Sequence, residues 1–467
     1  MLVCWSVVAT AGQALAAPVS AAQSIPQPPD ATAPGPAPAP GKPPPAGVEE
    51  VGARTEFSKT FDNPDGTKSL QIAVEPLHFK GANSAWQDIV SAVAADSAAP
   101  GSFVSGANSW TAHFGPLPGG VVIDTAAGPV SFSPVGAAAV RPQRLPDGTG
   151  VVYPDAWPGA DLRYRVRAGG VKEEIVLKQR PSTNKFDFTT SGITFDATAG
   201  GGLAPKTIKL LGWLISVPAT KPLGSIAPPE VQDARGTPLA LAAPVLTATT
   251  KTGGSTLRVA FDQTAVAALP DSAYPVVVDP TWNSNNMYSW KSDGVNCACG
   301  VRVGNTLEPG GINKYWRSTG LFDYSNILGA HVYSARIDLS SLTAGTANGY
   351  QIDADWASAN SYTGAPGYGT YATTSGDDTT SAILTGTTST SLTALYDYWV
   401  HSNIPGGVIG FVGQETPGLY TFKQFSSYIL TLTYGSTVAP PPTGVTSTDV
   451  RPITGNSPDV ITEILHP

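Results

Sequence analysis

Charged residues are scarce in this chain of 467 residues: only 13% are Asp, Glu, Lys or Arg, about half the usual share in a soluble globular protein. Acidic side chains outnumber basic ones by 35 to 27, which gives a net charge of −8, and the sequence contains no run of Lys or Arg. Because binding to phosphates needs a basic patch, the composition argues against a nucleic-acid partner.

Catalytic motifs are also missing from the sequence. The five histidines are far apart, without the H-x-x-x-H or H-E-x-x-H spacing of metalloenzymes, and they are His78, His113, His331, His401 and His466. The sequence has no G-x-S-x-G elbow, phosphate-binding glycine loop or dinucleotide-binding glycine motif. We interpret each histidine as an isolated side chain, and we predict that the protein is not an enzyme.

Cysteine is rare, with three residues at Cys4, Cys297 and Cys299. Zinc needs four ligands, and no second Cys or His pair accompanies the last two cysteines. Side chains at i and i+2 of a strand point to the same face, so Cys297 and Cys299 form either a strained local disulfide or a pair of thiols.

Long apolar runs are absent except at the start of the chain, where residues 2–17 are mostly apolar. This run is too short for a membrane-spanning helix, and Ala14-Leu15-Ala16 has the small-x-small pattern of a signal-peptide cleavage site. No Lys or Arg precedes it, so we expect the true start to lie upstream of Met1. We predict a signal peptide at residues 1–17, export to the cell surface or medium, and no membrane span after its removal.

Glycine and proline, in contrast, are abundant, with 50 and 43 residues. Both interrupt helices, whereas the accompanying Val and Thr favour strands, so we predict an all-β protein with short strands and no major helix. Residues 18–50 are rich in Pro and Ala, which indicates a disordered, extended linker.

Two β-rich regions follow the linker. Residues 51–281 contain hairpin patterns such as 57–61 and 70–74 around Asn63-Pro64-Asp65-Gly66. In this region Glu173 and Glu174 are adjacent on a predicted strand, so at least one of them is expected to face water. Residues 282–435 have the strand spacing and Gly-rich turns of an antiparallel β-sandwich or jelly roll. Residues 436–467 return to linker composition, and we expect the chain to be cut short there.

Aromatic residues are the first candidates for function in the second region. Sugar-binding sandwiches stack a pyranose on an exposed ring while nearby polar groups bind its hydroxyls. The candidate ligand-binding residues are Trp316, Trp356, Tyr362, Tyr368 and Tyr371. For Trp356 and Trp399 a place in the core is the favoured interpretation, and the three tyrosines are the better candidates for exposure.

Two carboxylates are the second candidates. Asp353 and Asp355 alternate on a predicted strand beside Trp356 and would share one face. They could contribute to a structural Ca²⁺ site or to glycoside hydrolysis, but a solvated strand face is the favoured interpretation. No other cofactor is expected.

Residues 51–281 resemble the leader segment of large secreted Rhs/YD-repeat proteins of the polymorphic-toxin class. The matching segments are RTEFSKTF at 54–61, ANSWTAHFGP at 107–116, VVYPDAWPGADL at 151–162 and YPVVVDPT at 274–281. The resemblance implies an export or surface system with a downstream YD-repeat or toxin polypeptide as a partner. No tandem YD repeats are present in the sequence.

Residues 282–435 resemble the DNRLRE-type β-sandwich, which is similar to the family 96 carbohydrate-binding modules. The matching residues are Arg317-Ser318, Phe322-Asp323, Ser325, Ile327, Gly329-Ala330, Val332 and Ser334-Ala335. The resemblance implies a glycan or cell-wall polysaccharide as the ligand. The sequence therefore predicts a non-catalytic secreted scaffold with a glycan-binding sandwich; the alternatives are a free-standing carbohydrate-binding protein and a polysaccharide-cleaving enzyme.

Overall fold

A computed structural model describes most of residues 47–435. The segments inside this range that it does not describe are 198–202, 211–212, 217–224, 227–228, 240–243, 252–253, 280–281, 284–286, 294–295, 298–299, 309–310, 347–349, 351, 358–371, 374–381 and 385–391. The predicted signal peptide at 1–17, the linker up to residue 46 and the tail at 436–467 also lie outside the described residues.

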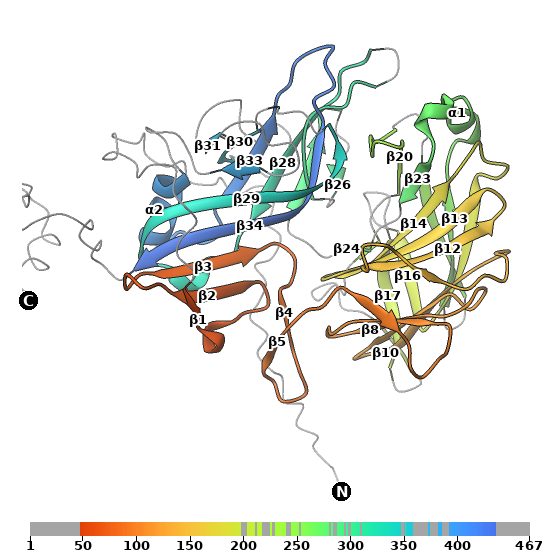
Figure 1. Cartoon of the computed structure of the whole chain (residues 1–467), viewed down its shortest axis with the longest axis horizontal. Helices are drawn as coiled ribbons and strands as arrows, with labels where there is room; N and C mark the ends of the chain where they lie inside the picture. The colour runs from red at the N-terminus through yellow and green to blue at the C-terminus, as the bar shows by residue number, and fades with distance from the viewer. Residues whose placement is uncertain are drawn as a thin grey trace, which may run out of the picture.

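The prediction of an all-β fold is confirmed. All the strand pairs in the described part of the chain are antiparallel, and they form two lobes of layered sheets (Figure 1). Strand β13 shows the local reason, because its residues alternate strictly between buried and half-buried along its length. Such a period of two suits a strand with one face in a core.

The N-terminal lobe, residues 93–283, contains two large sheets and one smaller sheet. The eight-stranded sheet has the order β21 (Val245–Lys251), β22 (Gly254–Ala260), β15 (Lys185–Ser191), β10 (Gly128–Pro134), β9 (Val121–Thr125), β8 (Thr111–Phe114), β7 (Phe103–Ser105) and β6 (Val93–Ala95). The six-stranded sheet has the order β11 (Gln143–Arg144), β12 (Gly150–Trp157), β13 (Ala160–Arg167), β14 (Gly170–Leu177), β23 (Val276–Asp279) and β20 (Glu230–Gln232). The smaller sheet contains β16 (Ile193–Ala197), β17 (Leu203–Leu210), β18 (Trp213–Ser216), β19 (Ser225–Ile226) and β24 (Trp282–Asn283).

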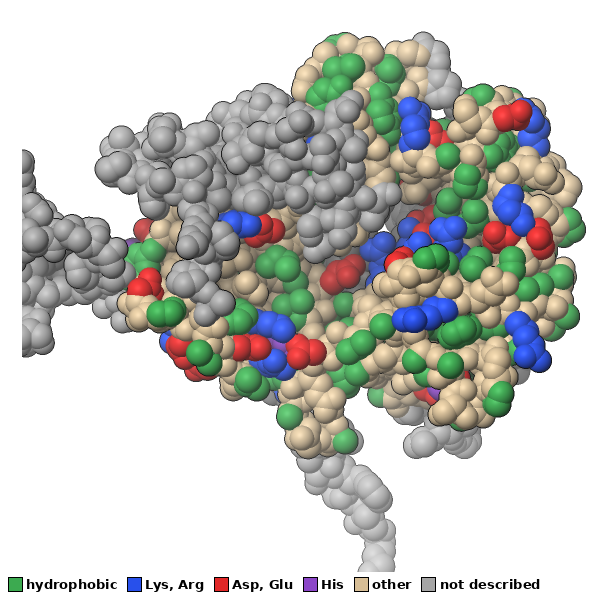
Figure 2. Space-filling model, in the orientation of Figure 1, with side chains coloured by type: hydrophobic (Ala, Val, Ile, Leu, Met, Phe, Trp, Pro, Cys, Tyr) green, Lys and Arg blue, Asp and Glu red, His purple; other side chains and the backbone are tan. Residues whose placement is uncertain are grey.

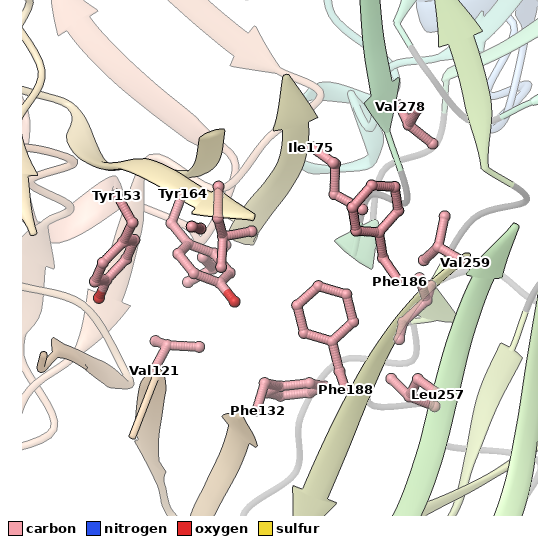
Figure 3. Packing of buried hydrophobic residues seen from close by; sticks show 14 of the residues in the cluster. Val121, Phe132, Tyr153, Tyr164, Ile175, Phe186, Phe188, Leu257, Val259 and Val278 are labelled. Carbon is pink, nitrogen blue, oxygen red and sulfur yellow. The ribbon is translucent and has the colours of Figure 1, made fainter. Parts of the chain in front are cut away.

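The core of the N-terminal lobe lies between its two large sheets (Figure 3). Trp157 meets Phe186 and Phe188 edge-to-face, with ring centroids 4.9 and 5.9 Å apart, and its indole N–H donates to the carbonyl of Val135. Between β22 and β23 the chain forms the short helix α1 (Gln263–Ala267), which is capped by the carboxylate of Asp262, and a 3₁₀ turn, η3 (Asp271–Ala273).

The C-terminal lobe is sandwich-like. One layer contains β1 (Val48–Glu49), β2 (Ser58–Asp62), β3 (Lys68–Ala73), β34 (Lys423–Gly435), β29 (His331–Gly345) and β32 (Ala382–Leu384). The other contains β26 (Asn296–Cys297), β25 (Met287–Lys291), β28 (Tyr315–Leu321), β33 (Val408–Gly413), β30 (Ile352–Trp356) and β31 (Ala372–Thr373). Strand β27 (Val301–Asn305) pairs with β34 and then with β28, and so connects the layers. The hairpin of β4 (His78–Lys80) and β5 (Trp86–Asp88) lies beside β2, with Lys59 on β2 paired to Asp88.

The first strands of the chain belong to the C-terminal lobe. The predicted hairpin of residues 57–74 is present as β2 and β3, but β3 pairs with β34, more than 350 residues later in the chain. Leu70, Ile72 and Val74 pack in the core of the C-terminal lobe. At the other boundary, β24 pairs with β19 and so lies in the N-terminal lobe. The two lobes therefore do not follow the expected division at residues 51–281 and 282–435.

The core of the C-terminal lobe contains a helix that the sequence patterns do not predict. Helix α2 (Leu392–His401) buries five residues, and the rings of Tyr396 and Trp399 pack against Tyr324. Its side chains also bind β29, because Asp397 accepts a hydrogen bond from the backbone N–H of Val332. The 3₁₀ turns η1 (Val51–Ala53) and η4 (Ser325–Ile327) complete the described elements.

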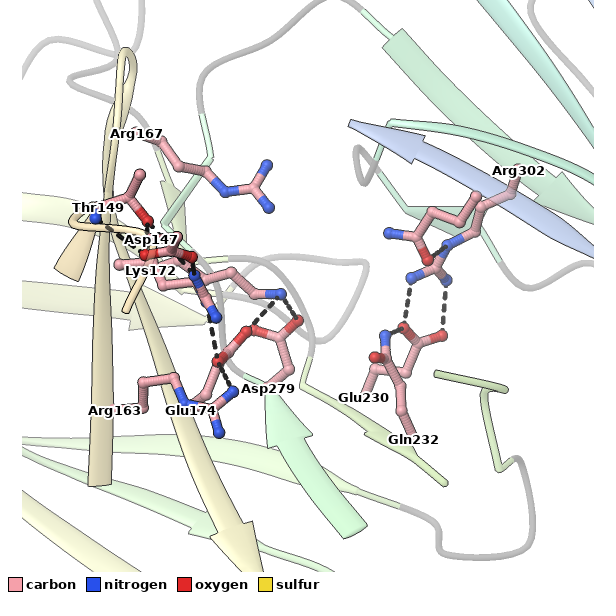
Figure 4. Close-up of polar contacts among 12 residues, drawn as sticks. Asp147, Thr149, Arg163, Arg167, Lys172, Glu174, Glu230, Gln232, Asp279 and Arg302 are labelled. Carbon is pink, nitrogen blue, oxygen red and sulfur yellow. Dashed lines mark hydrogen bonds and ion pairs between the residues drawn. The ribbon is translucent and has the colours of Figure 1, made fainter. Parts of the chain in front are cut away.

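The two lobes are joined by a buried ion pair (Figure 4). Arg302 on β27 binds both carboxylate oxygens of Glu230 on β20, at 2.6 and 2.5 Å, and donates a third hydrogen bond to Gln424. Burial opposes the charge on Glu230, but the Arg302 guanidinium holds the pKa of this carboxyl below its usual value. Removing one partner of such a pair would leave an uncompensated buried charge.

A second charge cluster covers the outer face of β13 and β14 (Figure 4). Glu174 lies 3.1 Å from Arg163, 3.0 Å from Lys172 and 3.6 Å from Arg165. Burial alone would raise the pKa of Glu174, but these cations lower it. Of the two adjacent glutamates, Glu174 is buried in this cluster, whereas Glu173 is half-buried and lines a cavity of the N-terminal lobe. On the face in Figure 2, charges of both signs lie near one another.

Candidate functional site

Several predicted site residues lie outside the part of the chain that the structure describes. These are Tyr362, Tyr368, Tyr371 and Cys299. Cys297 is the last residue of β26. The choice between a disulfide and two thiols for Cys297 and Cys299 therefore stays open, and the three tyrosines stay candidates from the sequence.

The candidate tryptophans of the C-terminal lobe lie in its interior. Trp316 is only 1% exposed, and the charged ends of Arg302 and Lys291 lie 5.0 and 5.8 Å from its ring centroid. Because its faces are covered by protein, Trp316 cannot stack on a sugar, and we remove it from the candidate ligand residues. Trp356 is half-buried against the core and Trp399 is fully buried, as favoured for both from the sequence.

The candidate carboxylates lie on β30, between β33 and β31. Asp353 and Trp356 occupy opposite faces of this strand. Asp353 is 1% exposed, so the favoured interpretation of a solvated face is wrong for this residue. Among the described residues, no group of three or more His, Cys, Asp or Glu is placed to hold a metal ion.

The strand register places an aromatic pair on the same face as these carboxylates. We call this side of the sheet the aromatic face; it is formed by neighbouring positions on β25, β28, β33 and β30, of which Thr319, Val412 and Asp353 are buried. Its first row is Trp290, Arg317, Val412 and Asp353, and its second row is Tyr288, Thr319, Gly410 and Asp355. The sequence alone connects Asp353 with Asp355, but not with residues more than sixty positions earlier.

Tyr288 and Trp290 form the edge of the aromatic face. Their ring centroids are 6.2 Å apart with 31° between the planes, and both residues are half-buried. The indole N–H of Trp290 donates to the hydroxyl of Thr319 at 2.9 Å, which fixes the orientation of the ring. Neither residue is among the ligand-binding candidates predicted from the sequence. Their i, i+2 spacing in residues 287–291 nevertheless places two rings on one side of a strand.

An ion pair lies beside the two rings. Arg317 binds both carboxylate oxygens of Glu415, at 2.8 and 2.9 Å, and both side chains are 19% exposed. Such a bidentate pair holds the guanidinium and the carboxylate in a fixed position beside the rings. The aromatic face therefore combines ring surfaces with hydrogen-bonding groups, but it shows no arrangement of nucleophile and base.

Two histidines are not isolated, contrary to expectation. The rings of His331 and His401 stack with centroids 3.9 Å apart, and His331 Nδ1 lies 3.4 Å from a carboxylate oxygen of Asp397. The pair joins the start of β29 to the end of α2. We assign it to the packing of this helix.

No protein-family model matches the chain, and comparisons with curated proteins and with solved structures give no significant match. Within the described residues, neither α-helix has the length and apolar character to cross a membrane.

Proposed function

We propose that this protein is an exported, non-catalytic attachment scaffold that binds a cell-wall or cell-surface glycan through the aromatic face. The observation that supports this proposal is the rigid Tyr288–Trp290 pair beside the Arg317–Glu415 ion pair. The resemblance of residues 282–435 to carbohydrate-binding sandwiches favours the same ligand class.

The chemistry of this face suits a pyranose. The C–H face of the sugar is apolar and stacks on aromatic rings, while its hydroxyls need donors and acceptors in the same plane. Tyr288 and Trp290 would offer the ring surface, and the polar Arg317–Glu415 pair lies beside it. A Ca²⁺ ion bound at Asp353 and Asp355 would be an addition to this site. Comparing glycan binding with and without Ca²⁺ tests whether the ion is needed.

The scaffold part of the proposal rests on the connection between the lobes. The Arg302–Glu230 pair joins them, and Thr237 in the N-terminal lobe forms a 2.7 Å hydrogen bond with Tyr420 in the C-terminal lobe. A fixed arrangement of this kind would hold a glycan-binding lobe at a set distance from an anchored partner. In the Rhs/YD interpretation, that partner is a downstream YD-repeat or toxin polypeptide.

The test is a polysaccharide pull-down with the full chain, because β2 and β3 complete a sheet of the C-terminal lobe and a fragment starting at residue 282 would lose them. Cell-wall glycans and acidic polysaccharides form the panel, each with and without Ca²⁺. We expect Trp290→Ala to lower binding by about 5- to 150-fold, since a stacked ring is worth about 1–3 kcal/mol.

The matched control is Trp86→Ala, which removes a half-buried tryptophan on the β4–β5 hairpin. This variant should bind as the wild type does. A second variant, Tyr362→Ala with Tyr368→Ala, tests the tyrosines predicted from the sequence. Absence of binding to the whole panel, or equal loss in the Trp86 variant, would contradict the proposed function.

A further inference from the structure

The N-terminal lobe contains a cavity between its two large sheets. Its volume is about 330 Å³, within the range of small-molecule sites. Its walls are mostly aliphatic and aromatic. The lining residues include Trp110, Ile123, Phe132, Tyr164, Glu173 and Phe188. Figure 3 shows the hydroxyl of Tyr164 pointing into the space bordered by Val121, Phe132 and Phe188.

Two polar side chains stand together in this apolar wall. Tyr164 on β13 and Glu173 on β14 are directly opposite in the strand register, and the tyrosine hydroxyl donates to Glu173 Oε2 at 3.1 Å. Along β14, Val171, Ile175 and Leu177 share the inward face with Glu173. A carboxyl group inside a β-sandwich core is costly and rare, so its presence calls for a role.

The environment keeps this carboxyl neutral at physiological pH. Burial raises the pKa of Glu173 to about 8; the negative charge of Asp279 acts in the same direction, and the hydrogen bond from Tyr164 opposes it. Burial also holds the pKa of Tyr164 well above its usual value. At pH 7 the pair therefore presents hydroxyl donors and oxygen acceptors without a charge.

The cavity reaches the surface at one end of the sandwich. Its lining there comes from the segment before β8, the β9–β10 turn and the β13–β14 turn, where Ser109 and Ala126 are exposed and Trp110 is half-buried. The side-chain amide of Asn108 donates to the carbonyl of Ala168 at 2.9 Å and so connects two of these segments. A ligand could enter between these turns without opening either sheet.

We propose that this cavity binds a small apolar alcohol or phenol, with Tyr164 and Glu173 hydrogen-bonded to its hydroxyl group. A cavity of about 150 Å³ accepts one benzene ring, so a volume of about 330 Å³ suits a bicyclic or short-chain molecule. The neutral pair gives the hydroxyl both a donor and an acceptor, and the apolar walls cover the rest of the ligand. This site is independent of the aromatic face, which lies in the other lobe.

Isothermal titration calorimetry of the full chain at pH 7 with two probes tests the proposal. The probes are 2-naphthol and naphthalene, which differ only in the hydroxyl group. We expect one saturable site for 2-naphthol and about tenfold weaker binding of naphthalene, the effect of one buried hydrogen bond. In Glu173→Leu the preference for 2-naphthol over naphthalene should fall, because only Tyr164 remains to bond the hydroxyl group, while naphthalene binding stays within about twofold.

A second pair of variants tests the location. Ile123→Trp places a large ring in the cavity and should abolish binding of both probes, whereas Val122→Trp, on the opposite face of β9, should leave binding unchanged. Circular dichroism checks that each variant is folded. Absence of saturable 2-naphthol binding by the wild type, or an unchanged preference for 2-naphthol in Glu173→Leu, would overturn the proposal, even if Ile123→Trp does not fold.

Discussion

The two lobes are both layered antiparallel sheets, but their interiors differ. In the C-terminal lobe, α2 lies against the sheets, and the rings of Tyr324, Tyr396 and Trp399 fill the space with centroids 5.3 to 6.4 Å apart. In the N-terminal lobe, the described residues leave a cavity with Tyr164 and Glu173 on its wall. The same architecture can therefore give a filled core in one lobe and a ligand-sized space in the other.

Two buried tyrosine hydroxyls, one in each lobe, also differ in their partners. In the C-terminal lobe, the hydroxyl of Tyr324 donates to the carbonyl of Ile404 and accepts from the N–H of Gly407, so it is satisfied by fixed backbone. In the N-terminal lobe, the hydroxyl of Tyr164 meets a titratable side chain that borders the cavity. The backbone partners of Tyr324 stabilise the fold of the C-terminal lobe. The carboxyl group of Glu173, in contrast, can form a further hydrogen bond to a ligand while it is bonded to Tyr164.

The largest effect on stability should come from removing an aromatic ring from the filled core of the C-terminal lobe. Trp399→Ala removes a fully buried ring that contacts Tyr324 and Tyr396, and we expect a loss of about 3–5 kcal/mol in the free energy of unfolding. Urea unfolding followed by circular dichroism measures it. A loss below about 1 kcal/mol would mean that α2 is not part of the folded core.

A smaller effect on stability should appear when Glu173, the carboxyl group beside the cavity of the N-terminal lobe, is replaced by a residue that cannot ionise. The pKa of Glu173 is raised by burial to about 8, so the stability that its protonation contributes is complete below about pH 4.5 and is lost as the pH rises through about 8. Glu173→Gln keeps the shape and cannot ionise. We expect it to match the wild type at pH 5 and to be more stable by roughly 2–4 kcal/mol at pH 9.

The measurement is the difference between the urea unfolding free energies of the two proteins from pH 5 to pH 9. Groups that titrate in both proteins and do not interact with residue 173 cancel to first order in this difference. A difference that stays constant with pH would show that Glu173 has an ordinary pKa and is hydrated.

The smallest effects come from adding volume to each core. A Cβ at Gly407 would lie 2.5 Å from the Trp399 ring, so Gly407→Ala should destabilise the protein by about 1–3 kcal/mol. Val130 borders the cavity, so Val130→Leu should change stability by less than about 1 kcal/mol. Thermal unfolding measures the stability of the two variants. Equal losses of stability would contradict the difference in packing between the two cores.

Local patterns predict much of this fold. The alternating residues 57–74 form a hairpin, and Asp353 and Asp355 belong to one strand, both as the sequence predicts. The partner of that hairpin is not predictable in the same way, because pairing of β3 with β34 connects opposite ends of the chain. Short-range periodicity shows that a strand forms but not which strand it meets.

Sequence patterns predict the candidate sites only in part, for a similar reason. The period of two along residues 171–177 already places Glu173 on the same face as Val171 and Ile175, yet a pair of adjacent glutamates indicates a solvated strand when the opposing sheet is unknown. Trp316 illustrates the converse, because only the packing of Arg302 and Lys291 against its ring shows that it is covered. Exposure depends on contacts between distant segments.

A crystal structure of the full chain soaked with 2-naphthol would test the contrast between the lobes most directly. The account predicts density for the ligand in the N-terminal lobe, with its hydroxyl within hydrogen-bonding distance of Tyr164 and Glu173, and an unchanged, filled core around Trp399 in the C-terminal lobe. A cavity closed by side chains of the N-terminal lobe, or the ligand bound only elsewhere, would contradict it.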